Sequence, residues 1–393
     1  MQSMNATPNA DRIQIGIFGK TNTGKSSLIN ALTGQKVSVV SEMEGTTTDP
    51  VFKSMEYDSL GPVLFMDSPG SCDTTQLSGE RAGQTMRIMR RADIAVILTT
   101  DEKDLEREKE LARWFEDRKV PVIFVQSRAD ESDQMLPGCI RVSVRTGEGL
   151  GELKEALIRL GNQIPKNTVL GNLVKEKDSV LLVMPQDASA PKGRLILPQV
   201  QVMRELLDRH CVITCVAPEE LGQALSVMTH MPDLVITDSQ VFDRVDDVIG
   251  GRCRLTSFSI LMAAAKGDLA VFLEGAQAMI QLQSGARVLI AETCTHAPKE
   301  EDIGRVKLPN LIQKKLGITI KTTVAVGLDF PKDLSGYDLV LQCGGCMNNR
   351  RQILSRIEDA KVAGVPITNY GIAIAKLGGI IDRVSLPESR SEK

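Results

Sequence analysis

Two short cysteine motifs in the C-terminal part of the chain have the residue types and spacing of a metal site. Cys294 is followed two residues later by His296, and further along the chain Cys343 and Cys346 enclose a pair of glycines. Thiolates and imidazoles are the usual ligands of zinc and of iron–sulfur clusters. Structural metal sites normally have four protein ligands, so three thiols leave one position available. The sequence therefore predicts a metal site that can accept a further group.

The spacing of these ligands does not by itself identify the metal. Cys294, His296, Cys343 and Cys346 would form a closed zinc site, whereas the three thiols alone would hold an iron–sulfur cluster with an open position. His296, or Glu301 on the loop after Cys294, is a candidate labile fourth ligand. His296 can equally be a loop histidine bonded to backbone, and Glu301 can be a solvated charge.

A phosphate-binding sequence follows an apolar run at residues 13–18. Gly19-Lys20-Thr21-Asn22-Thr23-Gly24-Lys25-Ser26 leads into a helical pattern, which is the context that a phosphate loop requires. In such loops the backbone N–H groups surround the β-phosphate, the lysine bridges the β- and γ-phosphates, and the hydroxyl binds Mg²⁺. The predicted nucleotide-binding residues of this segment are Gly19, Asn22, Thr23, Gly24, Lys25, Ser26 and Ser27.

Two later segments have the features of GTPase switch regions. Asp67 ends the apolar run 63–66, where its carboxylate can reach Mg²⁺ through water, and the amide of Gly70 can reach the γ-phosphate. Thr46 and Thr47 lie in a polar loop, and Thr47 is the predicted Mg²⁺ ligand, although such a loop can also be an ordinary turn. Together with Lys25, the residues Thr47, Asp67 and Gly70 are the predicted catalytic groups.

A third segment has the position of a base-reading loop. Ser127-Arg128-Ala129-Asp130 follows the apolar run 120–125, and the carboxylate of Asp130 can accept the N1–H and N2–H groups of guanine. Ser143 and Val144 supply a second base-binding turn. Ser127 is shorter than the asparagine that usually begins this motif, so its contact to the base is weaker. We expect GTP and GDP to be the ligands.

These motifs require a sheet whose strand ends meet at one edge. Apolar β-branched runs alternate with amphipathic stretches, which predicts an α/β fold with mostly parallel strands. The cysteine motifs follow two of these runs, and ligands collect beyond the carboxyl ends of parallel strands. Gly344 and Gly345 permit a tight loop, and a helix starting near Asn348 can stabilise thiolate charge. The predicted strands are 13–18, 63–66, 94–98, 120–125, 140–144, 180–184, 212–216, 234–237, 287–291, 318–326, 338–341 and 365–368.

Turn residues divide the chain into three predicted α/β domains. Gly161 to Asn167 interrupts the pattern after the first domain, and Lys266-Gly267-Asp268 interrupts a helical stretch where the aspartate is a capping residue. We predict a GTP-binding domain at 1–166 with a phosphate-loop GTPase fold, a middle domain at 167–265, and a cysteine-bearing domain at 266–393.

The composition argues against several other classes of protein. The 393 residues carry a formal charge of −3, with one Trp and three Tyr, which favours neither nucleic acid nor a membrane as partner. Residues 1–11 lack the charged start and apolar core of a secretory signal, so we expect a cytoplasmic protein in which the eight cysteines do not form disulfides. Cys211 and Cys215 alternate along a predicted strand and are interpreted as buried small hydrophobes.

The nucleotide motifs resemble those of the bacterial GTPases of the tRNA-modifying and ribosome-assembly types, over about Ile13 to Leu160. This resemblance implies that Asn22 helps to hold a potassium ion that aids hydrolysis. Ser71 stands where signalling GTPases have the glutamine that orients the attacking water, which implies slow hydrolysis.

The combination of these motifs with the cysteines, along nearly the whole chain, resembles the HydF family of [FeFe]-hydrogenase maturation GTPases. The resemblance implies that Cys294, Cys343 and Cys346 hold a [4Fe–4S] cluster with an exchangeable fourth position, and that the middle domain forms a homodimer. Gln342 stands where the family commonly has a histidine, so we expect no ligand there.

In that family the protein is a scaffold for the di-iron precursor of the hydrogenase active site. Two radical-SAM enzymes supply the precursor components, and the apo-[FeFe]-hydrogenase receives the product. The alternative from another class is a potassium-dependent ribosome- or tRNA-associated GTPase with a zinc-binding C-terminal domain. A third possibility is a structural metal domain that only recruits a partner.

Overall fold

The computed structural model describes residues 8–34, 52–57, 59–69, 80–165, 168–186, 193, 195–293 and 302–388. The chain divides into two compact units, Met1–Lys166 and Asn167–Lys393. Each is built from parallel strands and covering helices, so the predicted α/β class is confirmed. Among the described residues, no helix is both long enough and apolar enough to span a bilayer.

The first unit contains a six-stranded sheet with the order β2-β3-β1-β4-β5-β6. Neighbouring strands are parallel, except that β2 is antiparallel to β3. Its elements are η1 (Asn9–Asp11), β1 (Ile13–Gly19), α1 (Lys25–Thr33), β2 (Phe52–Tyr57), β3 (Gly61–Asp67), α2 (Glu80–Met89), β4 (Ile94–Thr99), α3 (Glu102–Glu116), β5 (Val122–Ser127), η2 (Ala129–Glu131), β6 (Cys139–Val142) and α4 (Leu150–Gln163).

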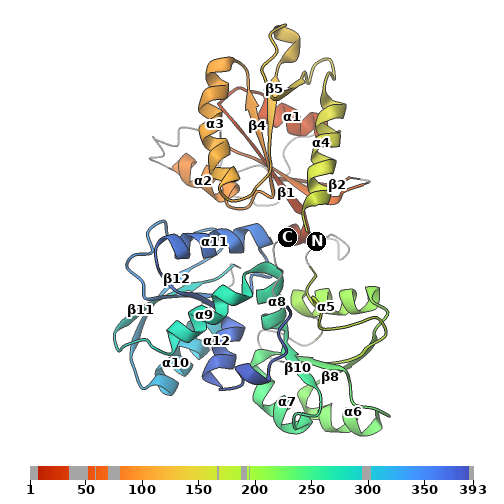
Figure 1. Ribbon diagram of the computed structural model, residues 1–393, viewed down its shortest axis with the longest axis vertical. Helices are drawn as coiled ribbons and strands as arrows, with labels where there is room; N and C mark the ends of the chain where they lie inside the picture. The colour runs from red at the N-terminus through yellow and green to blue at the C-terminus, as the bar shows by residue number, and fades with distance from the viewer. Residues whose placement is uncertain are drawn as a thin grey trace. The chain divides into compact units, whose positions relative to one another are not determined.

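Helices cover both faces of this sheet because its central strands are apolar on both sides. α1 and α4 pack on one face, where Leu28 and Leu157 contact Ile15 and Val96. α2 and α3 pack on the other face (Figure 1). β1, at the centre of the sheet, ends directly at the phosphate loop, and β3 beside it ends at Asp67. The sheet therefore brings these two predicted motifs to the same edge.

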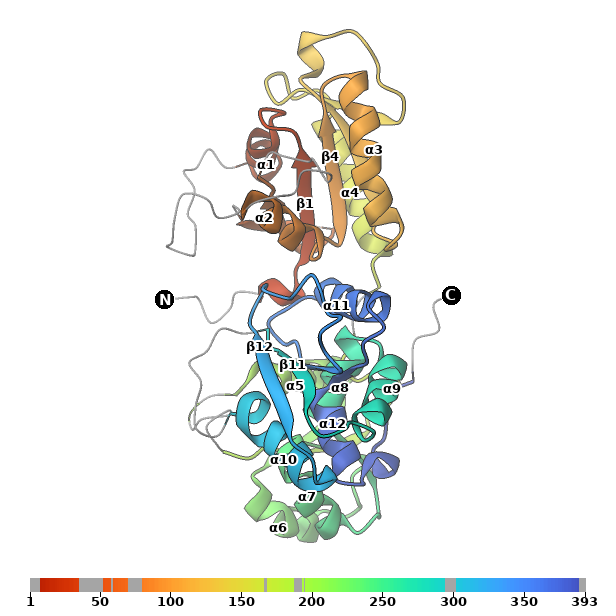
Figure 2. The ribbon, with the colours of Figure 1, turned by 90° about the vertical axis from the view of Figure 1, so that its left-hand side faces the viewer.

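The second unit contains two four-stranded parallel sheets with the orders β10-β9-β7-β8 and β12-β11-β13-β14. β12 forms one edge of the second sheet (Figure 2). The elements are β7 (Ser179–Val183), α5 (Leu197–Asp208), β8 (Val212–Val216), η3 (Pro218–Glu220), α6 (Leu221–Val227), β9 (Leu234–Thr237), η4 (Ser239–Val241), α7 (Phe242–Ile249), β10 (Arg254–Ser257), α8 (Phe258–Lys266), α9 (Leu269–Met279), β11 (Ala286–Ala291), η5 (Ile303–Lys307), α10 (Leu308–Leu316), β12 (Ile320–Ala325), β13 (Leu339–Gln342), α11 (Arg350–Val362), β14 (Ile367–Asn369), α12 (Tyr370–Leu377) and η6 (Ile381–Arg383).

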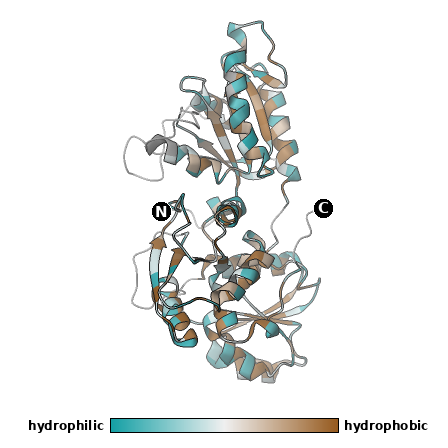
Figure 3. Ribbon diagram, turned by 60° about the vertical axis from the view of Figure 1, so that its left-hand side comes forward, coloured by the Kyte–Doolittle hydropathy of each residue, from teal (hydrophilic) through white to brown (hydrophobic). Residues whose placement is uncertain are grey.

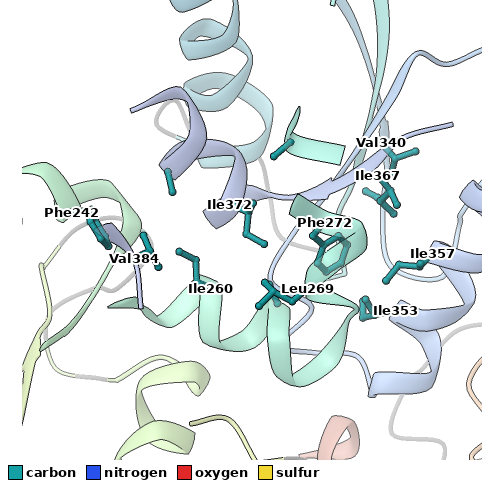
Figure 4. Close-up of a cluster of buried hydrophobic side chains, with 14 of the residues drawn as sticks. Phe242, Ile260, Leu269, Phe272, Val340, Ile353, Ile357, Ile367, Ile372 and Val384 are labelled. Atoms are coloured by element: carbon teal, nitrogen blue, oxygen red, sulfur yellow. The ribbon is translucent and has the colours of Figure 1, made fainter. Parts of the chain in front are cut away.

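One continuous apolar core joins the two sheets of the second unit. It includes Phe242 of α7, Ile260 of α8, Phe272 of α9 and Ile357 of α11, together with strand residues from both sheets (Figure 4). The strands are mainly hydrophobic, whereas the helices also carry hydrophilic residues (Figure 3). The end of the chain joins the same core, because Val384 forms a parallel bridge with Leu255 on β10.

A sharp corner separates α8 from α9. Asp268 caps α9 by accepting a hydrogen bond from the amide of Val271, at 3.2 Å, as the sequence predicts. Gly267 is required here because a Cβ atom would lie 2.2 Å from the ring of Phe272 and 2.9 Å from the carbonyl oxygen of Ala263. The corner fixes where the last residue of α8, Lys266, lies.

The predicted strands are found, with ends that differ by a few residues, but two further strands were missed. β2 mixes polar and apolar residues at a sheet edge, and β10 has only four residues, so neither has a long apolar run. The interpretation of Cys215 as buried was wrong. Cys211 is buried, whereas Cys215 is exposed because β8 is an edge strand whose two faces are only partly covered.

Candidate functional site

The phosphate loop has the local geometry that its sequence predicts. Gly24 precedes α1 with φ of 89°, a left-handed conformation that glycine adopts without strain. Lys25 begins the helix and is only 7% exposed. Its ammonium donates to the carbonyl oxygens of Gly19 at 3.0 Å and Lys20 at 2.6 Å. The loop is therefore folded around the amine that would contact the phosphates.

A hydroxyl and a carboxylate meet beside this loop. The hydroxyl of Ser26 donates a hydrogen bond to Oδ2 of Asp67 at the end of β3. Within the described residues, Oδ1 of Asp67 is buried and accepts no hydrogen bond. Burial raises the pKa of Asp67, and the Ser26 hydrogen bond and the charge of Lys25 oppose that rise. An orphaned carboxylate oxygen next to a hydroxyl fits the oxygen-rich, partly hydrated coordination of Mg²⁺.

The base-reading segment lines a hollow that continues to the phosphate loop. Its walls include Thr23, Gly24, Ser27, Ser127, Asp130 and Val144. Arg128, at φ of 56°, donates from its guanidinium to the carbonyl oxygen of Asn22 at 2.7 Å and so ties the two loops together. This contact was not anticipated from the sequence, because the two residues are far apart in the chain.

The carboxylate of Asp130 already has two partners. The hydroxyl of Ser143 and the guanidinium of Arg145 both donate to it, and together they hold its pKa below the usual range, with the Ser143 hydrogen bond the largest cause. Nη2 of Arg145 lies 2.7 Å from Oδ2, although the arginine side chain is 77% exposed. A guanidinium presents paired N–H donors, as the N1–H and N2–H edge of guanine does. Arg145 therefore occupies an oxygen of the carboxylate that the sequence predicts as the acceptor for guanine.

Replacing Arg145 with alanine is expected to strengthen GDP binding, by up to about fivefold, because an exposed ion pair is weak and guanine bound at the predicted acceptor would have to displace it. Titration with a fluorescent GDP analogue measures the change. The difference between the two proteins should shrink at high salt, since screening weakens the exposed pair. Weaker binding by the variant would instead mean that Arg145 contacts the bound nucleotide.

Several predicted residues lie outside the described part of the chain. These are Thr46, Thr47 and Gly70 of the switch segments, and Cys294, His296 and Glu301 of the C-terminal motif. The side chain of Asn22, the predicted potassium ligand, is exposed at the phosphate loop.

Cys343 and Cys346 lie on the loop between β13 and α11. β11 and β13 are paired in register, with Ala291 opposite Gln342, so both strands end at the same level. The amide of Cys343 donates to the carbonyl oxygen of Ala291 at 3.0 Å, and the hydroxyl of Thr293 lies 3.3 Å from the sulfur of Cys343. Thr293 directly precedes Cys294 in the sequence. The chain therefore enters the Cys294 segment beside the Cys343 thiol.

The turn between the two thiols depends on Gly345. Its φ is +68°, and the amide of Asn348 donates to its carbonyl oxygen at 3.0 Å. Asn349 then caps α11 by accepting from the amide of Gln352, so the helix begins immediately after the loop, close to the predicted start near Asn348. Burial and the neighbouring Cys343 raise the pKa of Cys346 to about 11, and Lys266 opposes this rise.

A buried arginine braces the strand ends beneath these thiols. Arg356 of α11 is 2% exposed, and its guanidinium donates to the side chain of Gln342 at 2.9 Å and to the carbonyl oxygen of Gly327 at 2.6 Å. Gln342 in turn donates to the carbonyl oxygen of Cys343 at 3.1 Å. The side chain at position 342 therefore supports the loop. Sequence reasoning missed Arg356 because a basic residue in a charged helix resembles a solvated one.

Soft thiol donors suit zinc or an iron–sulfur cluster equally. The described residues contain no group of three or more His, Cys, Asp or Glu side chains placed to hold a metal ion, and the Cys294 segment lies beyond them. The pair Cys343 and Cys346 is thus the described part of the predicted centre.

Three protein-family models match successive parts of the chain. A 50S ribosome-binding GTPase model matches residues 14–128, the hydrogen maturase F dimerization domain matches 169–267, and the hydrogen maturase F tetramerization domain matches 270–387.

Among curated proteins, the chain is similar to bacterial GTPases. GTPase Der of Nautilia profundicola is 28% identical over 206 residues, which are 47% of this chain and 44% of that protein. The tRNA modification GTPase MnmE of Coxiella burnetii is 32% identical over 158 residues, 37% of this chain and 34% of that protein. The chain thus spans less than half the length of these relatives. Among solved structures, the G domain of the T. maritima FeoB iron transporter is 24% identical, covers 38% of this chain and 98% of its own, and has a TM-score of 0.31.

The first sheet, its phosphate loop and the GTPase relatives define the N-terminal unit as a phosphate-loop GTPase domain that binds guanine nucleotides. The two domains that follow occur together in one family. The chain belongs to the hydrogen maturase F family, the hydrogenase maturation GTPases. Its dimerization and tetramerization domains support formation of an oligomer.

Proposed function

We propose that this chain is a GTP-hydrolysing scaffold that holds a [4Fe–4S] cluster on Cys294, Cys343 and Cys346 and carries the di-iron precursor to apo-[FeFe]-hydrogenase. The observation that carries the proposal is the contact between Thr293 and the Cys343 sulfur, at 3.3 Å. It brings the chain to the Cys343–Cys346 loop one residue before the third thiol. Three cysteine ligands leave one iron with an exchangeable position, where His296 or Glu301 would bind weakly until cargo arrives.

The nucleotide site would hydrolyse GTP by positioning and charge stabilisation. Lys25 would contact the β- and γ-phosphates, while Ser26, Thr47 and, through water, Asp67 would hold Mg²⁺. Asn22 would help to hold potassium, which supplies positive charge near the phosphates. The buried, unpartnered oxygen of Asp67 supports this assignment, since an ion or its water would satisfy it.

The partners follow from the family rather than from the geometry. We infer a homodimer through residues 167–265, exchange of cargo with two radical-SAM enzymes and the apo-hydrogenase, and a cytoplasmic location. The family model that matches residues 14–128 is that of a 50S ribosome-binding GTPase, which keeps a zinc-containing ribosome- or tRNA-associated GTPase as the alternative.

Anaerobic reconstitution of the full chain with iron and sulfide separates the two functions. The proposal predicts a brown protein with broad absorbance near ~400 nm and about four irons per chain. The Cys215→Ser variant is the control for cysteines outside the proposed centre. Cys215 is exposed on β8, so this variant should take up the same amount of iron as the unchanged chain. A colourless protein that retains about one zinc per chain would replace the proposed function with the alternative.

A further inference from the structure

A buried lysine lies directly against the loop that carries Cys343 and Cys346, called the thiol loop below. Lys266, the last residue of α8, is 4% exposed. Its ammonium donates to the carbonyl oxygen of Asn348 at 2.7 Å and to that of Cys346 itself at 3.4 Å. The backbone that carries the second thiol is therefore held by the end of a helix that precedes it by some 80 residues.

Arg350 makes a second connection between the same two segments, and here the donor lies on α11 and the acceptors lie at the end of α8. Arg350, the first residue of α11, donates from Nη1 to the carbonyl oxygens of Ala265 at 3.0 Å and Gly267 at 2.8 Å. These carbonyls flank Lys266 at the end of α8, where helix carbonyls have no intrahelical partner. Lys266 and Arg350 thus form a reciprocal clamp between the corner after α8 and the turn before α11.

The two sides of this clamp belong to different family domains. Lys266 lies in the segment that matches the dimerization domain, residues 169–267, whereas Cys343 and Cys346 lie in the segment 270–387. A residue of the preceding domain, Lys266, thus contacts the thiol loop of the following domain. A change in the position of α8 would be transmitted to the backbone of Cys346 and Asn348 through the two hydrogen bonds that Lys266 donates.

We propose that Lys266 is a positioning residue for the cluster, which fixes the backbone of Cys346 and places a buried positive charge beside the iron–sulfur centre. This inference rests on the proposed function, because it requires a cluster on these thiols. A positive charge in a low-dielectric interior favours the more negative, reduced state of a nearby centre. Lys266 would therefore raise the reduction potential and retain the metal, in addition to holding the loop.

Two variants of the full-length, reconstituted chain separate charge from packing. Lys266→Met keeps the length and apolar stem but removes the charge and the donors, and Lys266→Arg keeps both. We expect redox titration monitored by electron paramagnetic resonance to give a lower midpoint potential for Lys266→Met and a potential close to that of the unchanged protein for Lys266→Arg. Iron should be lost to a chelator about tenfold faster from Lys266→Met, as for other residues that support metal ligands.

The outcomes are distinguishable. If the unchanged chain takes up no cluster, the proposed function itself fails. If it does, and Lys266→Met takes up a cluster with unchanged potential and unchanged iron retention, this inference is overturned. If both folded variants lose iron at the same rate and show the same fall in midpoint potential, the inference is also overturned, because Lys266→Arg keeps the charge. Should Lys266→Met not fold, as judged by circular dichroism, Lys266→Gln replaces it, and a potential equal to that of Lys266→Arg contradicts the proposal.

Discussion

Replacing Lys25 with alanine is expected to lower the rate of GTP hydrolysis at least about 100-fold, the effect of removing one group that stabilises transition-state charge. Lys25 is buried at the start of α1, and its ammonium is held by the carbonyl oxygens of Gly19 and Lys20. Alanine removes this ammonium and with it a positive charge that would compensate the phosphates. Phosphate release under saturating GTP measures the effect.

The same substitution also removes two hydrogen bonds that fold the loop, so binding must be measured separately from turnover. GDP affinity is expected to fall as well, since phosphate-loop lysines contact the β-phosphate, which GDP retains. Lys109→Ala is the matched control, because Lys109 lies on the exposed face of α3 and forms an exposed ion pair with Glu106. Retention of more than about a tenth of the hydrolysis rate by Lys25→Ala would contradict the assigned role.

Local sequence signals predicted the parts of the molecule whose structure is decided locally. The run from Ile13 to Gly19 forms a strand because it is apolar, and the loop after it is set by its glycines. Asp268 was recognised as a cap from its position after Gly267 alone. By contrast, β10 has only four residues and is stabilised as a strand by β9 and by the bridge to Val384, which no local pattern reveals.

The supporting groups of both sites depend on contacts between distant segments, so the sequence could not identify them. In the sequence, Lys266 is a basic residue at the end of a predicted helix, where basic residues are common. Its position under Cys346 results from the corner at Gly267 and from the pairing of β11 with β13. Arg145 directly follows the predicted turn at Ser143 and Val144, and its contact with Asp130 arises because the loops after β5 and β6 lie side by side.

Replacing Cys343 with serine is expected to lower the iron content after anaerobic reconstitution at least about tenfold, because a neutral hydroxyl is a poor ligand for iron where a thiolate is required. Cys343 follows β13 directly, and its amide donates to the carbonyl oxygen of Ala291, which fixes the backbone of this ligand at the strand end. Iron analysis and absorbance near ~400 nm measure the loss. Cys253→Ser, at a half-buried thiol before β10, serves as the control.

Thermal unfolding of the same variant, in the metal-free and reconstituted states, decides between an open loading site and a structural metal domain. The second unit has a continuous apolar core that includes Phe272, Val340 and Ile357, and burial of this apolar surface stabilises the unit. We therefore expect Cys343→Ser to unfold at nearly the same temperature as the metal-free unchanged chain, with only function and iron lost. A closed structural site supplies much of the folding free energy of its domain. A large drop in the unfolding temperature of the variant, together with an equal drop on removing metal from the unchanged chain, would therefore assign the cysteines to structural support rather than to loading.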